Sequence, residues 1–139
     1  MTIQNLSLFI ADKISNRNIR QKLKLLNDFY SRDALEREEI IFNKLAFTLK
    51  NAYEYVPYYY DLAEKYNLRD IFLNFKIDKF KDIPTLDKNI LKSNKKFFLK
   101  PDTADNLNYC FTNGSTGGRI SIAYNQDAID WSSAVTIYC

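Results

Sequence analysis

All three glycines of this 139-residue chain, Gly114, Gly117 and Gly118, lie within five consecutive residues. They belong to the stretch NGSTGG, residues 113–118, which separates two short segments in which apolar and polar residues alternate. A period of two is typical of β-strands, so we predict strands at residues 107–111 and 120–124, joined by this loop. The rest of the chain must make its turns without glycine.

The glycine-rich loop has two interpretations. Asn113-Gly114 by itself is a strong hairpin signal, because both residues tolerate positive φ, but a tight turn has no use for Ser115 and Thr116. Alternatively, small residues let the backbone approach a ligand, and converging N–H groups with the hydroxyls of Thr112, Ser115 and Thr116 suit phosphate oxygens. Walker A and dinucleotide-binding loops both open a helix, whereas a strand follows here, so neither motif fits.

Helical periodicity dominates the chain before the strands. Residues 34–56 give the strongest pattern, with Asp33 as N-cap and Glu36 as its capping-box partner. The expected apolar stripe consists of Phe42, Leu45, Leu49, Ala52 and Val56. Pro57 should end this helix, since proline cannot continue the backbone hydrogen bonding. Weaker periodicity in residues 1–30 fits one or two helices.

A tyrosine-rich segment follows Pro57, and the four-residue spacing of Tyr58, Leu62 and Tyr66 predicts a short helix. The tyrosines could form a stacking platform for bases or sugars, or simply cover helix faces in a partly hydrated core. The second interpretation is favoured, because no other feature of this segment indicates a nucleic-acid partner.

Two more helices are expected. Thr85, after Pro84, is the predicted N-cap of a helix over residues 86–94. This region is the most basic, with Lys88, Lys92, Lys95, Lys96 and Lys100, and a solvated face is favoured over an anion-binding patch. Asn125 should cap the last helix, whose expected apolar face consists of Ala128, Trp131, Val135 and Tyr138.

Composition excludes several function classes. Histidine is absent, which rules out a Ser-His-Asp triad and any histidine-ligated metal site, and Cys110 and Cys139 have no metal-binding spacing. The net charge of +3 is small for a dedicated nucleic-acid binder. The N-terminal residues resemble neither a signal peptide nor a membrane span, so we expect a soluble cytoplasmic protein.

Four segments carry a family resemblance. TNGSTG, residues 112–117, resembles the phosphate-loop motif of the adenylate-forming enzymes, the acyl-CoA synthetase superfamily. YEYVPYYYDLAEKYNL, FKDIPTLDKNILKSNKKFFL and AIDWSSA, which begin at residues 53, 80 and 128, are similar to segments of the phenylacetate–CoA ligase-like proteins in the same order and spacing. The branch is one often found with capsular and surface polysaccharide biosynthesis genes. The resemblance covers about residues 35–139.

The resemblance implies a function. Members use ATP, with magnesium, to convert a carboxylate into an acyl-adenylate, and many transfer the acyl group to coenzyme A. Carried over to this chain, the ATP-binding residues are Thr112, Asn113, Gly114, Ser115, Thr116 and Gly117. Arg119 and Ile120 depart from the family, which has proline and, in some branches, lysine there.

The sequence therefore predicts a mixed α/β fold that forms an incomplete piece of the large N-terminal domain of such a ligase. Residues 1–105 should be mainly helical, 106–125 should form the hairpin with the phosphate loop, and 126–139 should begin the next helix. The family's other catalytic motifs would lie downstream, so we expect no adenylation by this chain and assign it no catalytic or metal-binding residue. The alternative is a non-catalytic helical module that binds nucleotides or a protein.

Overall fold

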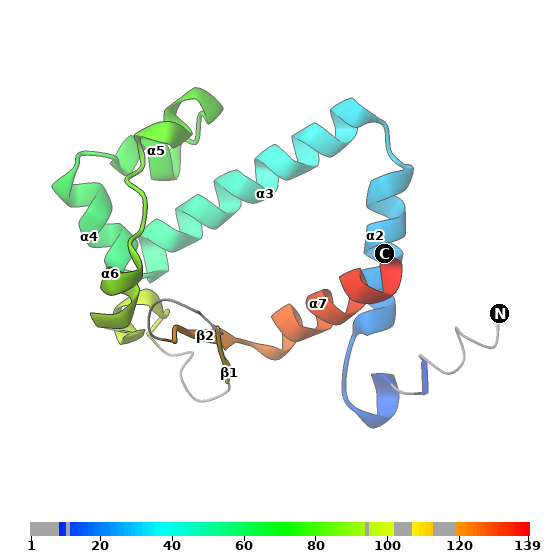
Figure 1. Ribbon diagram of the computed structural model, residues 1–139. Helices are drawn as coiled ribbons and strands as arrows, with labels where there is room; N and C mark the ends of the chain where they lie inside the picture. The colour runs from blue at the N-terminus through cyan, green and yellow to red at the C-terminus, as the bar shows by residue number, and fades with distance from the viewer. Residues whose placement is uncertain (1–8, 11, 94, 102–106, 113–118) are drawn as a thin grey trace. The chain divides into compact units, whose positions relative to one another are not determined.

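A computed structural model describes residues 9–10, 12–93, 95–101, 107–112 and 119–139. Its contacts divide the chain into two compact units. The first comprises residues 1–37, 107–110 and 123–139, and the second comprises residues 38–106 and 111–122. The described part is mostly helical, with one two-stranded antiparallel hairpin before the C-terminal helix (Figure 1).

The first unit is built on two helices that pack against each other, α2 (Ile19–Ser31) and α7 (Gln126–Tyr138). Asn125 caps α7 as the sequence predicts, because its side-chain oxygen accepts a hydrogen bond of 2.8 Å from the N–H of Ala128. At the other end of α7, the ring of Tyr138 stacks on that of Tyr30, with centroids 5.1 Å apart.

Helix α3 (Ala34–Tyr55) begins in the first unit, and its residues from 38 onward belong to the second. The second unit also contains the helices α4 (Pro57–Lys65), α5 (Arg69–Leu73) and α6 (Lys88–Ser93), and the 3-10 helices η1 (Ile77–Asp82) and η2 (Lys95–Phe98). Its core gathers side chains from α3, α4, α5 and the turn after α5: Leu49, Tyr53, Leu62, Ala63, Phe72 and Phe75. Phe72 is fully buried. The α3–α4 corner therefore holds this unit together.

Two asparagines occupy the left-handed backbone position that follows a helix C-terminus, where glycine is the usual residue. Asn67 follows α4 with a φ of 54°, and the N–H of Leu68 donates to the carbonyl of Ala63 at 2.8 Å. Asn16 has a φ of 50°, and the N–H of Arg17 donates to the carbonyl of Asp12 at 2.9 Å. Both arrangements are Schellman caps, for which asparagine is the usual substitute for glycine.

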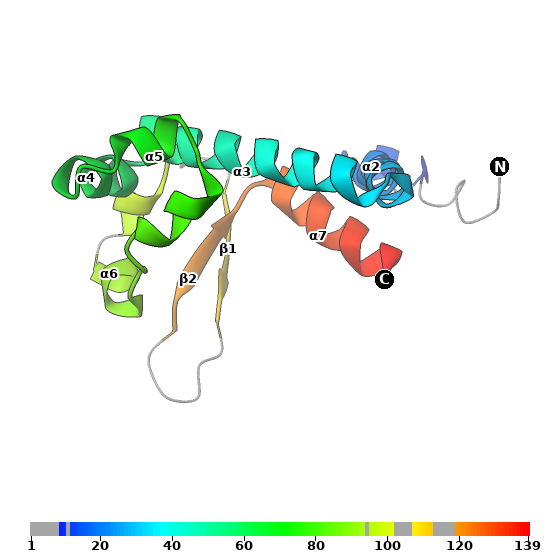
Figure 2. The same cartoon turned by 90° about the horizontal axis from the view of Figure 1, so that it is seen from above.

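The hairpin consists of β1 (Asn108–Phe111) and β2 (Ser121–Tyr124), which lie side by side in Figure 2. Thr112 pairs with Ile120, so the two strands align residue for residue. This register places Tyr109 and Phe111 on one face of the hairpin and Ile122 and Tyr124 on the other. Both faces are therefore apolar, which the alternation within each strand could not reveal.

The strongest predicted helix is confirmed. The N–H of Glu36 donates to the Asp33 carboxylate at 2.9 Å, and α3 ends at Tyr55, two residues before Pro57. Within the stripe, Leu49 is buried, and Leu45 and Ala52 pack against the core. Phe42 is 41% exposed, although its ring lies 5.2 Å from that of Phe75. Val56 lies outside the helix and becomes the N-cap of α4.

Two predictions need correction. The helix expected from residue 86 with a Thr85 cap begins at Lys88, because Asp87 takes the capping role and accepts the N–H of Asn89 at 2.6 Å. On α7, the buried residues are Asp130 and Ala134, whereas Val135 and Tyr138 of the predicted apolar face are 45% and 38% exposed. Asp130 turns inward because donors from the chain before α2 satisfy its carboxylate.

Candidate functional site

The hairpin closes the base of the predicted phosphate loop. The backbone N–H of Thr112 donates to the carbonyl of Ile120 at 3.0 Å, and the N–H of Ile120 donates to the Thr112 hydroxyl oxygen at 3.2 Å. Thr112 thus joins the residue before the loop to Ile120 after it, through both its backbone N–H and its side-chain hydroxyl. Because its hydroxyl accepts this bond, its own proton remains available to a phosphate oxygen.

The other predicted loop residues, Asn113, Gly114, Ser115, Thr116 and Gly117, lie outside the described residues. On the far side of the loop, Arg119 is exposed and directly precedes Ile120. An arginine at this place has donors that suit phosphate oxygens.

In the first unit, the phenol of Tyr124 and the thiol of Cys110 form a hydrogen bond. The Cys110 thiolate would repel a phenolate, and this interaction, together with burial and a hydrogen bond to Cys110, raises the pKa of Tyr124. Tyr124 therefore stays neutral at physiological pH. Cys110 and Cys139 are both exposed free thiols.

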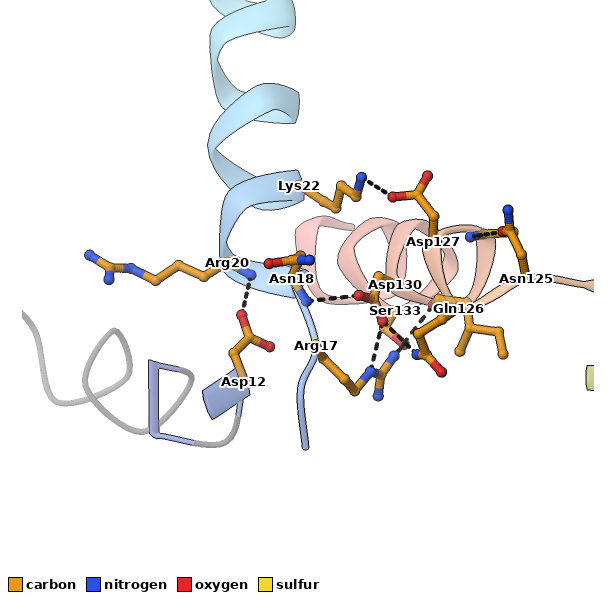
Figure 3. Close-up of polar contacts among 12 residues, drawn as sticks. Asp12, Arg17, Asn18, Arg20, Lys22, Asn125, Gln126, Asp127, Asp130 and Ser133 are labelled. Carbon is orange, nitrogen blue, oxygen red and sulfur yellow. Dashed lines mark hydrogen bonds and ion pairs between the residues drawn. The ribbon is translucent and has the colours of Figure 1, made fainter. Parts of the chain in front are cut away.

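A buried carboxylate joins α7 to the chain before α2 (Figure 3). Asp130 is 2% exposed and accepts three hydrogen bonds, from Arg17 Nε at 2.8 Å, the Asn18 N–H at 2.7 Å and Gln126 Nε2 at 2.9 Å. The Arg17 guanidinium also donates to the Ser133 hydroxyl at 2.8 Å. Asp130 thus has partners on both oxygens, as a buried ion requires.

The electrostatics of Asp130 follow from these partners. Burial opposes its ionisation, but the hydrogen bonds from Arg17, Asn18 and Gln126 outweigh that effect, so the pKa of Asp130 lies below its ordinary value. The carboxylate is therefore charged at neutral pH. Both of its oxygens accept from groups that join α7 to the chain before α2, so the carboxylate stabilises the packing of these two segments.

The lowered pKa predicts a pH-dependent stability. The Asp130 carboxyl binds a proton more readily in the unfolded chain than in the folded one, so its contribution is complete above about pH 4 and disappears as the pH falls further. We expect Asp130→Asn to lower the urea midpoint more at pH 7 than at pH 3. The same difference at both pH values would contradict this assignment.

The α3–α4 corner also carries a mainly apolar hollow of about 610 Å³. Its lining includes three tyrosines, two carboxylates and a lysine: Tyr53, Tyr55, Tyr60, Glu54, Asp61 and Lys100. The Tyr53 hydroxyl donates to Glu64 at 2.9 Å, and this bond, with burial, raises the pKa of Tyr53. Lys100 Nζ lies 4.1 Å from the centroid of the Tyr55 ring. Tyr58 and Tyr59 instead pack against the core.

Sequence reasoning missed the cluster of Arg17, Asp130, Gln126 and Ser133. No local signal could have found it, because Arg17 and Asp130 are 113 residues apart in the sequence. Within the described ranges, no three Cys, Asp or Glu side chains gather closely enough to hold a metal ion. The helices of the described part are also too short or too polar to cross a membrane.

Comparisons of the chain with protein-family models, with curated proteins and with solved structures give no match.

Proposed function

We propose that this chain is the N-terminal part of an ATP-dependent carboxylate-activating ligase, and that residues 112–117 hold the ATP phosphates. The observation that carries the proposal is the strand–loop–strand arrangement. β1 ends at Phe111 and β2 begins at Ser121, with Thr112 and Ile120 bonded to each other across the base of the loop. This is the arrangement that the sequence resemblance leads one to expect.

The chemistry of the loop supports the same proposal. A loop fixed at both ends by a strand pair can present backbone N–H groups to an anion with little loss of entropy on binding. The hydroxyls of Thr112, Ser115 and Thr116 add donors, and Arg119 adds a positive charge. Donors of these kinds would stabilise the charge that moves toward pyrophosphate when a carboxylate attacks the α-phosphorus of ATP.

In the reaction proposed for the whole ligase, and not for this chain by itself, a small-molecule carboxylate and magnesium-bound ATP give an acyl-adenylate and pyrophosphate. Coenzyme A is the proposed acceptor of the acyl group, and the proposed context is surface polysaccharide biosynthesis. Both follow from the resemblance of residues 112–117 and the three flanking segments to the phenylacetate–CoA ligase-like proteins.

The loop hydroxyls provide the test of this function. Replacing Ser115 and Thr116 together by alanine removes two donors, each worth about 1.5–3 kcal/mol when the acceptor is charged, so we expect MgATP affinity to fall at least about a hundredfold. Isothermal titration calorimetry measures the change. The matched control replaces Ser31 and Thr48, whose hydroxyls bond carbonyls of their own helices at 2.8 Å. Equal ATP affinity in both double variants would refute the role of the loop.

A further inference from the structure

Residues 9–24 form one of two strongly basic stretches of the chain, the other being residues 86–100. Residues 9–24 contain five basic side chains and one acidic side chain, a net charge of +4, whereas the whole chain carries +3. Residues 1–8 contain no charged side chain, so the remaining 115 residues carry a net charge of −1. Residues 86–100, with five lysines and Asp87, carry the same net charge of +4, so the side chains that surround the cations of residues 9–24 decide what this stretch can bind.

The structure brings these side chains around one hollow in the first unit. The hollow has a volume of about 530 Å³, and its lining includes Phe9, Asp12, Lys13, Arg17, Arg20 and Lys24. Two cations flank the Phe9 ring, with Lys13 Nζ 5.1 Å and Arg20 Cζ 5.5 Å from its centroid. The positive charges therefore converge on an aromatic ring at the surface.

Among the described residues that line the hollow, the carboxylate is that of Asp12; its Oδ2 faces the backbone, and its Oδ1 is buried without a hydrogen-bond partner. Asp12 accepts the N–H of Arg20 at 2.8 Å and so serves the first turn of α2 (Figure 3). Arg17 is committed to Asp130, and Lys22 is paired with Asp127 outside the hollow. Lys13, Arg20 and Lys24 are the remaining basic side chains that line the hollow.

Exposed apolar side chains belong to the same helical stretch as Lys13. Residues 9–10 and 12–14 are helical, and Phe9, Ile10 and Ile14 are 38%, 49% and 81% exposed. Ile14 is the most exposed large hydrophobic side chain in the described part of the chain. Cations next to exposed isoleucine and phenylalanine are typical of segments that lie in a membrane interface.

We propose that this surface, formed by Phe9, Ile10, Lys13, Ile14, Arg20 and Lys24, docks on an anionic lipid bilayer. The cations would contact phosphate and carboxylate headgroups, and Ile14 and Ile10 would enter the boundary with the acyl chains. A nucleic acid would pair with the cations but would leave the isoleucines in water. An anionic lipid surface would pair with the cations and also bury the isoleucines. This inference is independent of the proposed phosphate loop.

Vesicle co-sedimentation of the full chain tests the proposal. We expect binding to vesicles of phosphatidylcholine and phosphatidylserine at 3:1, and little binding to phosphatidylcholine alone. Each lysine near an anionic surface contributes about a fivefold gain in affinity, so Lys13→Gln with Lys24→Gln should weaken binding about 30-fold. Ile14→Ser should weaken it about tenfold, because an exposed isoleucine contributes only when it enters the bilayer.

The matched control is Lys88→Gln with Lys92→Gln, which removes the same charge from exposed positions on α6 and should leave vesicle binding unchanged. Three results would overturn the proposal: no binding to the anionic vesicles, equal loss in the α6 control, or unchanged binding of Ile14→Ser. Tighter binding to an oligonucleotide than to the vesicles, lost in the Lys13 and Lys24 variant, would assign the surface to nucleic acid instead.

Discussion

Replacing Asp130 by alanine is expected to destabilise the folded chain by about 3 kcal/mol. The substitution leaves the Arg17 guanidinium without its ion-pair partner and the Asn18 N–H without its acceptor. Breaking a buried ion pair from one side typically costs about 3–5 kcal/mol, and the 26% exposure of the Arg17 side chain places this case at the lower end. The free energy of unfolding in urea, followed by circular dichroism, measures the loss.

The exposed ion pair between Asp28 and Arg32 provides the control. Its side chains are 58% and 39% exposed, so Asp28→Ala should cost less than about 0.5 kcal/mol. If Asp130→Ala fails to fold, Gln126→Ala tests the same cluster with a smaller loss of stability. It removes one of the three donors to Asp130 and should cost about 1 kcal/mol. Stability unchanged in Gln126→Ala and in Asp130→Ala would mean that this cluster does not hold α2 and α7 together.

Replacing Phe72 by alanine is the second substitution with a large expected effect. Phe72 lies on the short helix α5, is fully buried, and has the Tyr53 and Tyr59 rings at centroid distances of 6.2 and 6.3 Å. Removing a buried phenylalanine side chain costs about 3–5 kcal/mol through lost burial and the cavity left behind. We expect a loss of this size in the urea-derived free energy of unfolding.

The matched control for this substitution is Phe47→Ala on α3. The Phe47 side chain is 70% exposed, so its removal should change the stability by no more than about 0.5 kcal/mol. Equal unfolding free energies for the Phe72 and Phe47 variants would show that the core of the second unit does not lie at the α3–α4 corner.

Elements with local signals could be predicted from the sequence. The start of α3 depends on Asp33 and its end on Pro57, and both signals lie within a few residues of the boundary that they set. The hairpin followed from alternation within two short segments. The start of α6 was harder, because Thr85 and Asp87 are both capable caps two residues apart, and the sequence does not rank them.

Features that depend on distant pairings could not be predicted. Arg17 and Asp130 are 113 residues apart, so the apolar periodicity of α7 could not show that its inner side carries a carboxylate. The two apolar faces of the hairpin depend on the pairing of Thr112 with Ile120 across the loop. Of the predicted site, the structure describes Thr112, and residues 113–117 stay a prediction.

The central claim is that residues 112–117 bind ATP phosphates, and backbone amide chemical shifts of the ¹⁵N-labelled chain test it most directly. Titration with magnesium and a non-hydrolysable ATP analogue should produce saturable shifts that are largest at residues 112–120. Lys13 and Lys24 at the basic N-terminal surface should change little. The absence of shifts at residues 112–120, or shifts concentrated at that basic surface, would contradict the claim.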